Sequence, residues 1–166
     1  MNFELKPISA DAIPEALQKV ERYRLLNEPA EAQSICEDIL RIDPDNQNAL
    51  VMLILTITDQ FGAGAVASEA RELIPRLNTE YQRAYCSGIV CERSAKVLMH
   101  KHIPGANHKA YEELDAAMHW YERAESLRPP ENDDAILRWN TCVRLLKKNP
   151  ALQPRSQERY AEVLGE

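Results

Sequence analysis

The chain has little glycine and no excess of positive charge. Only five of its 166 residues are glycine, whereas alanine, leucine, glutamate, arginine and isoleucine are abundant, and this composition favours helix over sheet. Lysine and arginine number 20 against 26 acidic residues, so the formal net charge is −6. Non-specific nucleic-acid binding needs clustered cations that displace counterions, and we therefore expect no nucleic-acid partner.

Long apolar runs and secretory features are also missing. The longest apolar run, Ala49 to Ile57, is interrupted by Thr56 and is far shorter than the roughly 20 residues that span a bilayer. The segment from Met1 to Pro14 has no cationic start followed by an apolar stretch. We expect a single domain in the cytoplasm, with no membrane partner.

Sequence motifs for catalysis and cofactor binding are absent. The chain contains no glycine-rich phosphate loop, no His-Glu-x-x-His and no Gly-x-Ser-x-Gly. We expect neither an enzyme nor a bound cofactor. The cysteines form no Cys-x-x-Cys pair and lie within apolar helical patterns, which predicts buried, reduced thiols at Cys36, Cys86, Cys91 and Cys142.

Apolar residues recur at helical spacing in seven segments, and proline, glycine or asparagine separates most of them. The predicted helices span about 14–27, 29–43, 47–61, 66–77, 79–101, 108–127 and 132–148. Residues 1–13 are predicted to be an N-terminal extension, and residues 149–166 a C-terminal tail.

One short pattern occurs twice in the chain. The segment Asp45-Asn46-Gln47-Asn48-Ala49-Leu50 is echoed 86 residues later by Glu131-Asn132-Asp133-Asp134-Ala135-Ile136. Each copy follows a proline, Pro44 or Pro130, that closes a helical pattern, and an Asn or Asp side chain can then cap the next helix. The echo indicates a repeat protein.

The repeat resembles the tetratricopeptide repeat, a unit of about 34 residues built from two antiparallel helices. Glu15-Ala16-Leu17 aligns with Asn48-Ala49-Leu50 at an offset of 33. In the first unit, Tyr23, Ala32 and Asp43-Pro44 match the family's positions. The matches in the third unit are Gly88, Ala117, Tyr121, Ala124 and Pro129.

The chain departs from the family pattern in two units. Cys36 stands where an aromatic residue is usual, and the second unit lacks the terminal proline. The resemblance nevertheless implies that Ala32 and Ala117 lie buried at helix crossings.

The resemblance implies an all-α fold. Residues 14–148 would form a right-handed solenoid of antiparallel helical hairpins, with about three repeat units and a final helix. The echo equals two periods plus about 18 residues, which we assign to an insertion that extends the third hairpin, residues 79–127. A generic bundle of α-hairpins is the alternative.

The resemblance also implies a concave face that binds peptides. An amphipathic helix or an extended peptide could lie in an apolar groove with a charged rim, with Tyr85 as an aromatic anchor. In the alternative, the chain ends or the fifth helix fill the groove. The family's groove-facing positions correspond to Leu17, Asn48, Val51, Leu55, Gln82, Tyr85, Ile89, Arg93, Leu137 and Thr141, with Glu21, Arg24, Thr58, Glu92 and Arg144 beside them.

Some members of this family hold the C-terminal carboxylate of heat-shock chaperones with lysine, asparagine and arginine side chains. None of the matching residues here is a cation or an asparagine, so we expect no chaperone binding in this way. The matching residues are Leu17, Glu21, Met52, Gln82 and Cys86.

Histidines and lysines gather at the tip of the third hairpin. They are His100, His102 and His108 with Lys96, Lys101 and Lys109. Two histidines at i, i+2 point apart on a helix, so we predict a solvated loop and no metal site. A cationic surface for an acidic partner is the alternative.

The predicted function is that of a non-catalytic adaptor or scaffold. Such a protein would bind a protein or peptide partner through its concave face or through the projecting hairpin. The alternative is a self-assembling structural subunit, a homodimer with its apolar faces buried between the two copies.

Overall fold

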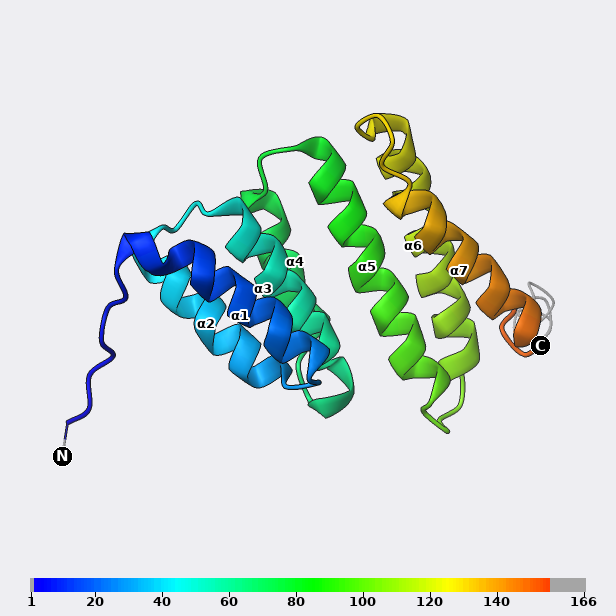
Figure 1. Cartoon of the computed structure of the whole chain (residues 1–166). Coiled ribbons are helices and arrows are strands. Elements are labelled where there is room, and N and C mark those ends of the chain that lie inside the picture. Colours follow the sequence, from blue (N-terminus) through cyan, green and yellow to red (C-terminus); the bar gives the residue numbers. More distant parts are fainter. Residues whose placement is uncertain (1, 156–166) are drawn as a thin grey trace.

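A computed structural model describes residues 2–155 of the chain (Figure 1). These residues contain α-helices and short 3-10 turns but no strand. Helix accounts for 73%, which confirms the all-α prediction. The helices are α1 (Ile13–Leu25), α2 (Pro29–Ile42), α3 (Gln47–Asp59), α4 (Ala67–Leu73), α5 (Glu80–Met99), α6 (Ala106–Leu127) and α7 (Asp134–Lys148). Within residues 2–155, every helix is too short or too polar to cross a bilayer.

Local chemistry explains where three of these helices begin. Pro29 occupies the first turn of α2, where its missing N–H would have no intrahelical partner. The side chain of Asn46 caps α3 by accepting a hydrogen bond of 3.0 Å from the Ala49 amide. Thr79 caps α5 by accepting one of 3.1 Å from the Gln82 amide. The predicted boundaries of these three helices agree with the structure to within a few residues.

The fourth helix is shorter than predicted. Pro75 cannot donate a backbone hydrogen bond, and the segment Ile74–Arg76 forms a 3-10 turn beyond the end of α4. Before α4, the segment Phe61–Ala63 makes another 3-10 turn, and Gly64 follows with a φ of 110°. The sequence predicted a helix over about 66–77 whose last turn Pro75 disturbs. In the structure only Ala67–Leu73 are α-helical, and the 3-10 turn lies where the disturbance was predicted.

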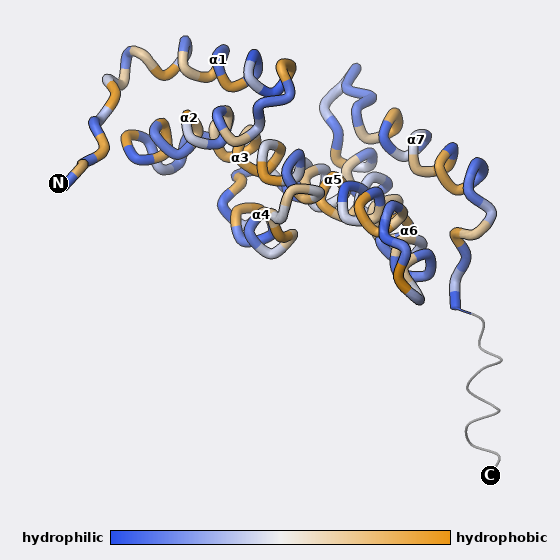
Figure 2. The backbone as a smooth tube through the Cα atoms, turned by 90° about the horizontal axis from the view of Figure 1, so that it is seen from below, coloured by the Kyte–Doolittle hydropathy of each residue, from blue (hydrophilic) through white to orange (hydrophobic). Residues whose placement is uncertain are grey.

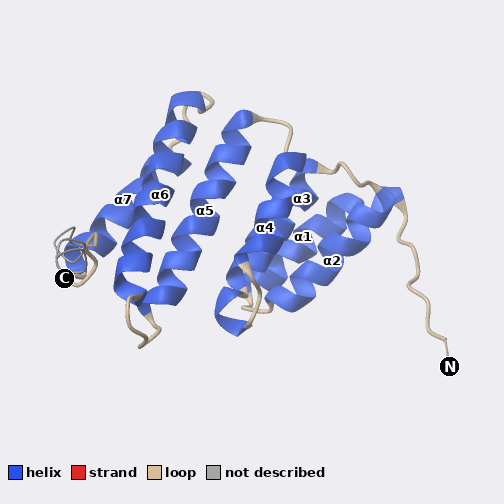
Figure 3. Ribbon diagram, turned by 180° about the vertical axis from the view of Figure 1, so that it is seen from behind, coloured by secondary structure: helices blue, strands red, loops and turns tan. Residues whose placement is uncertain are grey.

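The helices form a row that runs from α1 and α2 at one end to α6 and α7 at the other (Figures 1 and 3). Consecutive helices pack side by side, and the packing of α5 on α6 is the most extensive. The helix α3 also contacts α1 and α5. Seen from below, α1 and α7 lie toward the same side of α3 and α5, so the row is bowed (Figure 2).

The helix α5 separates two hydrophobic cores. Cys86 and Val90 on one face of α5 belong to an N-terminal core with α1 to α4. Ile89 and Ala95 on another face belong to a C-terminal core with α6 and α7. A smaller cluster joins Ile13 to α2 and α3. The middle helix therefore completes the packing of both halves.

Small residues and thiols are buried as predicted. Ala32 and Ala117 have no exposed surface. All four cysteines are free and buried. Gly88 lies against the ring of Tyr121, and a Cβ atom at this position would come within 2.4 Å of the ring. The close approach of α5 and α6 thus depends on a residue without a side chain.

Packing continues beyond both predicted domain boundaries. Before α1, Ala10–Ala12 form a 3-10 turn, and Ile13 is buried. After α7, Leu152 is buried in the C-terminal core, and a ring nitrogen of His108 lies 2.9 Å from the Gln153 carbonyl oxygen. The C-terminal segment therefore covers part of the turn between α5 and α6, which was expected to project alone. Residues 156–166 of the predicted tail lie outside the described part of the chain.

Candidate functional site

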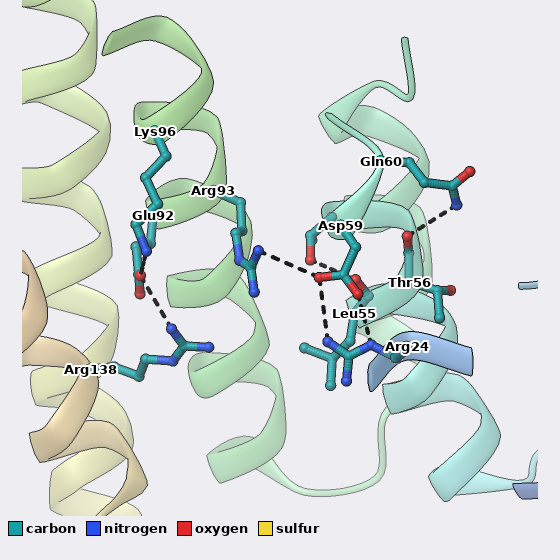
Figure 4. Close-up of polar contacts among 10 residues, drawn as sticks. Arg24, Leu55, Thr56, Asp59, Gln60, Glu92, Arg93, Lys96 and Arg138 are labelled. Atoms are coloured by element: carbon teal, nitrogen blue, oxygen red, sulfur yellow. Dashed lines mark hydrogen bonds and ion pairs between the residues drawn. The ribbon is translucent and has the colours of Figure 1, made fainter. Parts of the chain in front are cut away.

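Three charged side chains from the helices α1, α3 and α5 meet at one point (Figure 4). Asp59, the last residue of α3, accepts two hydrogen bonds from Arg24 in the last turn of α1, at 2.8 and 3.4 Å. Arg93, in the middle of α5, approaches the same carboxylate at 3.4 Å. One carboxylate thus faces two guanidinium groups.

Arg93 is less well satisfied than Arg24. Its contact with Asp59 is its one ion pair within residues 2–155. Its Nε atom is shielded from solvent and has no hydrogen-bond partner there. About 30% of the side chain remains exposed. A guanidinium group carries five N–H donors, so Arg93 has solvent-facing donors that protein groups of residues 2–155 leave unused.

Two hollows adjoin at Asp59 and Arg93. The first has a volume of about 520 Å³ and lies between α1, α3 and α5, with Leu25 and Met52 among its apolar walls. The second has a volume of about 400 Å³ and extends along α5 past Val97 to the end of that helix. Together they form an open surface that crosses three helices.

The second hollow is cationic although the chain as a whole is acidic. Arg93, Lys96 and Lys101 line it, together with one carboxylate, that of Asp59. Three cations against one acid contrast with the net charge of −6 of the whole chain. An anionic ligand would therefore be attracted more strongly to this hollow than to the rest of the protein surface.

A second polar cluster lies beneath this surface, on the other side of α5. Glu92 is completely buried, and its Oε2 accepts a hydrogen bond of 2.7 Å from the Tyr121 hydroxyl. Its Oε1 lies 2.5 Å from Lys96 Nζ and 3.3 Å from a guanidinium nitrogen of Arg138 (Figure 4). Burial, and then the adjacent Glu92 carboxylate, raise the pKa of Tyr121 far above its usual value. This cluster ties α5 to α6 and α7.

Two residues that were predicted to line the groove are interior residues instead. Ile89 is 1% exposed and belongs to the C-terminal core. Glu92 has no exposed surface. Neither side chain can contact a ligand in this structure, because α6 and α7 cover that face of α5.

The other predicted groove residues are dispersed. Leu55 and Tyr85 are partly buried against the C-terminal core, and the Tyr85 ring centroid lies 6.0 Å from that of Tyr121. Val51 packs on the N-terminal core, and Leu17 on the small cluster near Ile13. The side chains of Gln82 and Thr141 are partly exposed, while Asn48 and Leu137 are exposed. Of the main predicted set, Arg93 alone lines either of these two hollows.

Polar neighbours of the predicted set line the hollows in place of its apolar members. Glu21 and Arg24 line the first hollow, and Thr58 lines the second. Asp59 was not predicted as a site residue, although its position in the sequence carried a signal. A carboxylate in the last turn of a helix is disfavoured by the helix dipole unless cations compensate it. Such an acid at the end of an apolar helix predicts cationic partners from elsewhere in the fold.

The histidines near the end of α5 do not converge. One ring nitrogen of His100 lies 2.7 Å from the Lys96 carbonyl oxygen, whereas His108 faces the Gln153 backbone. Within residues 2–155, no group of three or more histidine, cysteine, aspartate or glutamate side chains is placed to hold a metal ion.

No family model matches the chain, and neither a curated protein nor a solved structure does so. The chemistry of the two hollows is therefore the basis for a functional assignment. Their lining combines open apolar walls with the cations Arg93, Lys96 and Lys101.

Proposed function

We propose that the protein is a non-catalytic adaptor that binds a segment of a partner protein on its concave surface. The helical row would be a solenoid similar to tetratricopeptide repeats, and the partner segment would lie across α1, α3 and α5. The observation that carries the proposal is the pair of adjoining hollows that share Asp59 and Arg93. Adjoining hollows across three helices suit an extended peptide better than a compact small molecule.

The apolar walls support the same proposal. Leu25 is 88% exposed at the end of α1, where it lines the first hollow beside Met52. A large aliphatic side chain that is left in water at the edge of a hollow gains free energy when a partner covers it. Charged groups at the centre of the surface would then fix the orientation of the bound segment.

Photo-crosslinking at two adjacent leucines tests this function. A photoreactive amino acid at Leu25 should capture a partner protein from the native lysate. The same amino acid at Leu26, which is also exposed but lines neither hollow, should capture much less. Equal capture at both positions, or none at Leu25, would contradict binding in the hollows.

A further inference from the structure

We propose that the partner segment is acidic, and that Arg93, Lys96 and Lys101 of the second hollow recognise its carboxylates. This inference rests on the function proposed above and specifies the chemistry of the partner. It further assigns a role to Asp59, which acts as an internal competitor because it shares Arg93 with the incoming carboxylate.

The unused donors of Arg93 are the first support. Arg24 makes the shorter contact with Asp59, at 2.8 Å, and Arg93 reaches the same group only at 3.4 Å. A guanidinium group binds a carboxylate best through two parallel hydrogen bonds of about 2.7–2.9 Å, and Asp59 does not provide these to Arg93. A second carboxylate in the hollow can supply them without displacing Arg24.

The lysines extend the cationic surface along α5. Lys101 is exposed and makes no ion pair within residues 2–155. Lys96 contacts the buried Glu92, yet about 33% of its side chain remains exposed in the hollow. Glu92 is also paired with Arg138, so its negative charge is shared between Arg138 and Lys96. Lys96 is therefore only partly neutralised, and the hollow keeps an excess of positive charge.

An acidic peptide fits this surface better than a nucleic acid does. The excess of cations is local, and the net charge of −6 repels a long polyanion that extends beyond the hollow. Apolar walls at Val97, Met52 and Leu25 adjoin the cations and can cover aliphatic side chains of a peptide. The complementary segment therefore alternates carboxylates with aliphatic residues.

Fluorescence anisotropy with defined peptides tests the inference on the full chain. The probe is a fluorescein-labelled peptide of about ten residues built from glutamate, leucine and serine, and its counterpart carries glutamine in place of glutamate. The acidic probe should bind at least about tenfold more tightly, and its affinity should fall as salt is raised. Equal binding of both probes would overturn the proposal.

Matched variants assign the recognition to named residues. Arg93→Gln should weaken binding of the acidic probe about tenfold, and Lys101→Gln about threefold. Lys109→Gln makes the same charge change beyond the same turn, outside both hollows, and should leave affinity unchanged. Equal losses for Lys101→Gln and Lys109→Gln would show a diffuse charge effect and contradict the site.

The role of Asp59 gives the sharpest test, because it predicts a gain. Asp59→Asn keeps the shape of the side chain but releases both guanidinium groups from its charge, so the acidic probe should bind about threefold to tenfold more tightly. Circular dichroism confirms that the variant is folded. An unchanged or weaker affinity in the folded variant would contradict internal competition, and if the variant does not fold, the Arg93 and Lys101 results decide the proposal.

Other occupants of the hollow give different outcomes. If single-stranded RNA binds as tightly as the acidic probe, the hollow binds any anionic polymer through charge alone, and the proposal is overturned. If Glu158→Gln with Glu162→Gln in the full chain raises affinity for the probe, the chain's own acidic segment occupies the hollow, and the assignment to a partner is wrong. If neither peptide binds but Leu25 still captures a partner, the adaptor function stands and only the acidic chemistry fails.

Discussion

Gly88 shows how a single position controls the contact between two helices. Alanine in a helix interior is normally more stable than glycine by about 0.5–1 kcal/mol. At Gly88, however, the added Cβ would lie 2.4 Å from a ring carbon of Tyr121. Gly88→Ala should therefore destabilise the protein by about 1–3 kcal/mol in chemical denaturation, because the buried ring must shift.

The control for this variant is another glycine. Gly62→Ala places its Cβ in open space, at a position without a positive φ, and should change the free energy of unfolding by less than about 1 kcal/mol. If Gly88→Ala is as stable as Gly62→Ala, the helices α5 and α6 are not as close as the structure places them.

Glu92 is a buried charge whose partners come from three helices. Glu92→Gln keeps the shape but removes the charge that Lys96 and Arg138 neutralise, and it weakens the hydrogen bond from Tyr121. Breaking a buried ion pair costs about 3–5 kcal/mol, and partial exposure of the two cations reduces the expected loss here to about 2–3 kcal/mol. Denaturant unfolding measures this loss.

Glu80 provides the comparison on the same helix. It pairs with Arg123 at an exposed site, so Glu80→Gln should cost less than about 0.5 kcal/mol. Equal effects of the two substitutions would mean that Glu92 is solvated in solution.

The buried thiols predict how stability changes at alkaline pH. Burial raises the pKa of Cys36 from 9.0 to about 12, so the thiol of the unfolded chain ionises first. The stability contributed by the neutral buried thiol is complete below pH 9 and is lost as the pH rises toward 12. Between pH 8 and 10, wild type should lose about 1.4 kcal/mol more than Cys36→Ala. Identical losses, measured by urea unfolding at both pH values, would contradict a buried neutral thiol.

At the scale of elements, the segment after α7 is part of the packed structure. Leu152 is 6% exposed and joins the C-terminal core. Leu152→Ala should destabilise the protein by about 2 kcal/mol, because it leaves a cavity against α6 and α7. Leu137→Ala on α7, where the side chain is 62% exposed, should cost less than about 0.5 kcal/mol. Thermal denaturation of both variants tests this prediction. A larger loss of stability for Leu152→Ala shows that the segment after α7 is docked, and equal small losses show that it is solvated.

Helix boundaries were predictable where short-range chemistry sets them. The start of α2 at Pro29 and the cap of α3 at Asn46 depend on residues within one turn, and the sequence displays them directly. Pro75 was predicted to disturb the last turn of the fourth helix, but the end of α4 at Leu73 was not predicted, because apolar spacing continues to Leu77. Local signals thus predicted where helices lie, but not how regular each one is.

The site was less predictable because it depends on which faces other helices cover. The positions carried over from the repeat family predicted that Ile89 and Glu92 face a ligand. In the structure, the packing of α6 and α7 on α5 buries both side chains. The pairing of Asp59 with Arg24 and Arg93 joins residues far apart in the chain. The position of Asp59 at a helix end predicts cationic partners but not which residues they are.

At the scale of the whole molecule, the exposed apolar side chains argue for a monomer. They come from separate elements, with Phe3 and Leu5 in the N-terminal segment, Leu25 and Leu26 at the end of α1, and Trp120 on α6. A stable dimer usually buries at least about 1,200 Å² in one well-packed patch. Light scattering should therefore give a mass near 18.9 kDa at all dilutions. A dimer that persists on dilution would favour the self-assembling subunit instead.

The position of α5 between two cores also has a consequence for synthesis on the ribosome. The first four helices emerge before α5, and until then the N-terminal core lacks Cys86 and Val90. Nascent chains of this length expose an unfinished apolar face, which is a surface that chaperones bind and that aggregates readily. A ribosome that pauses when only α1 to α4 have emerged would prolong this exposure. A pause after α5 has emerged would come when the N-terminal core is already complete.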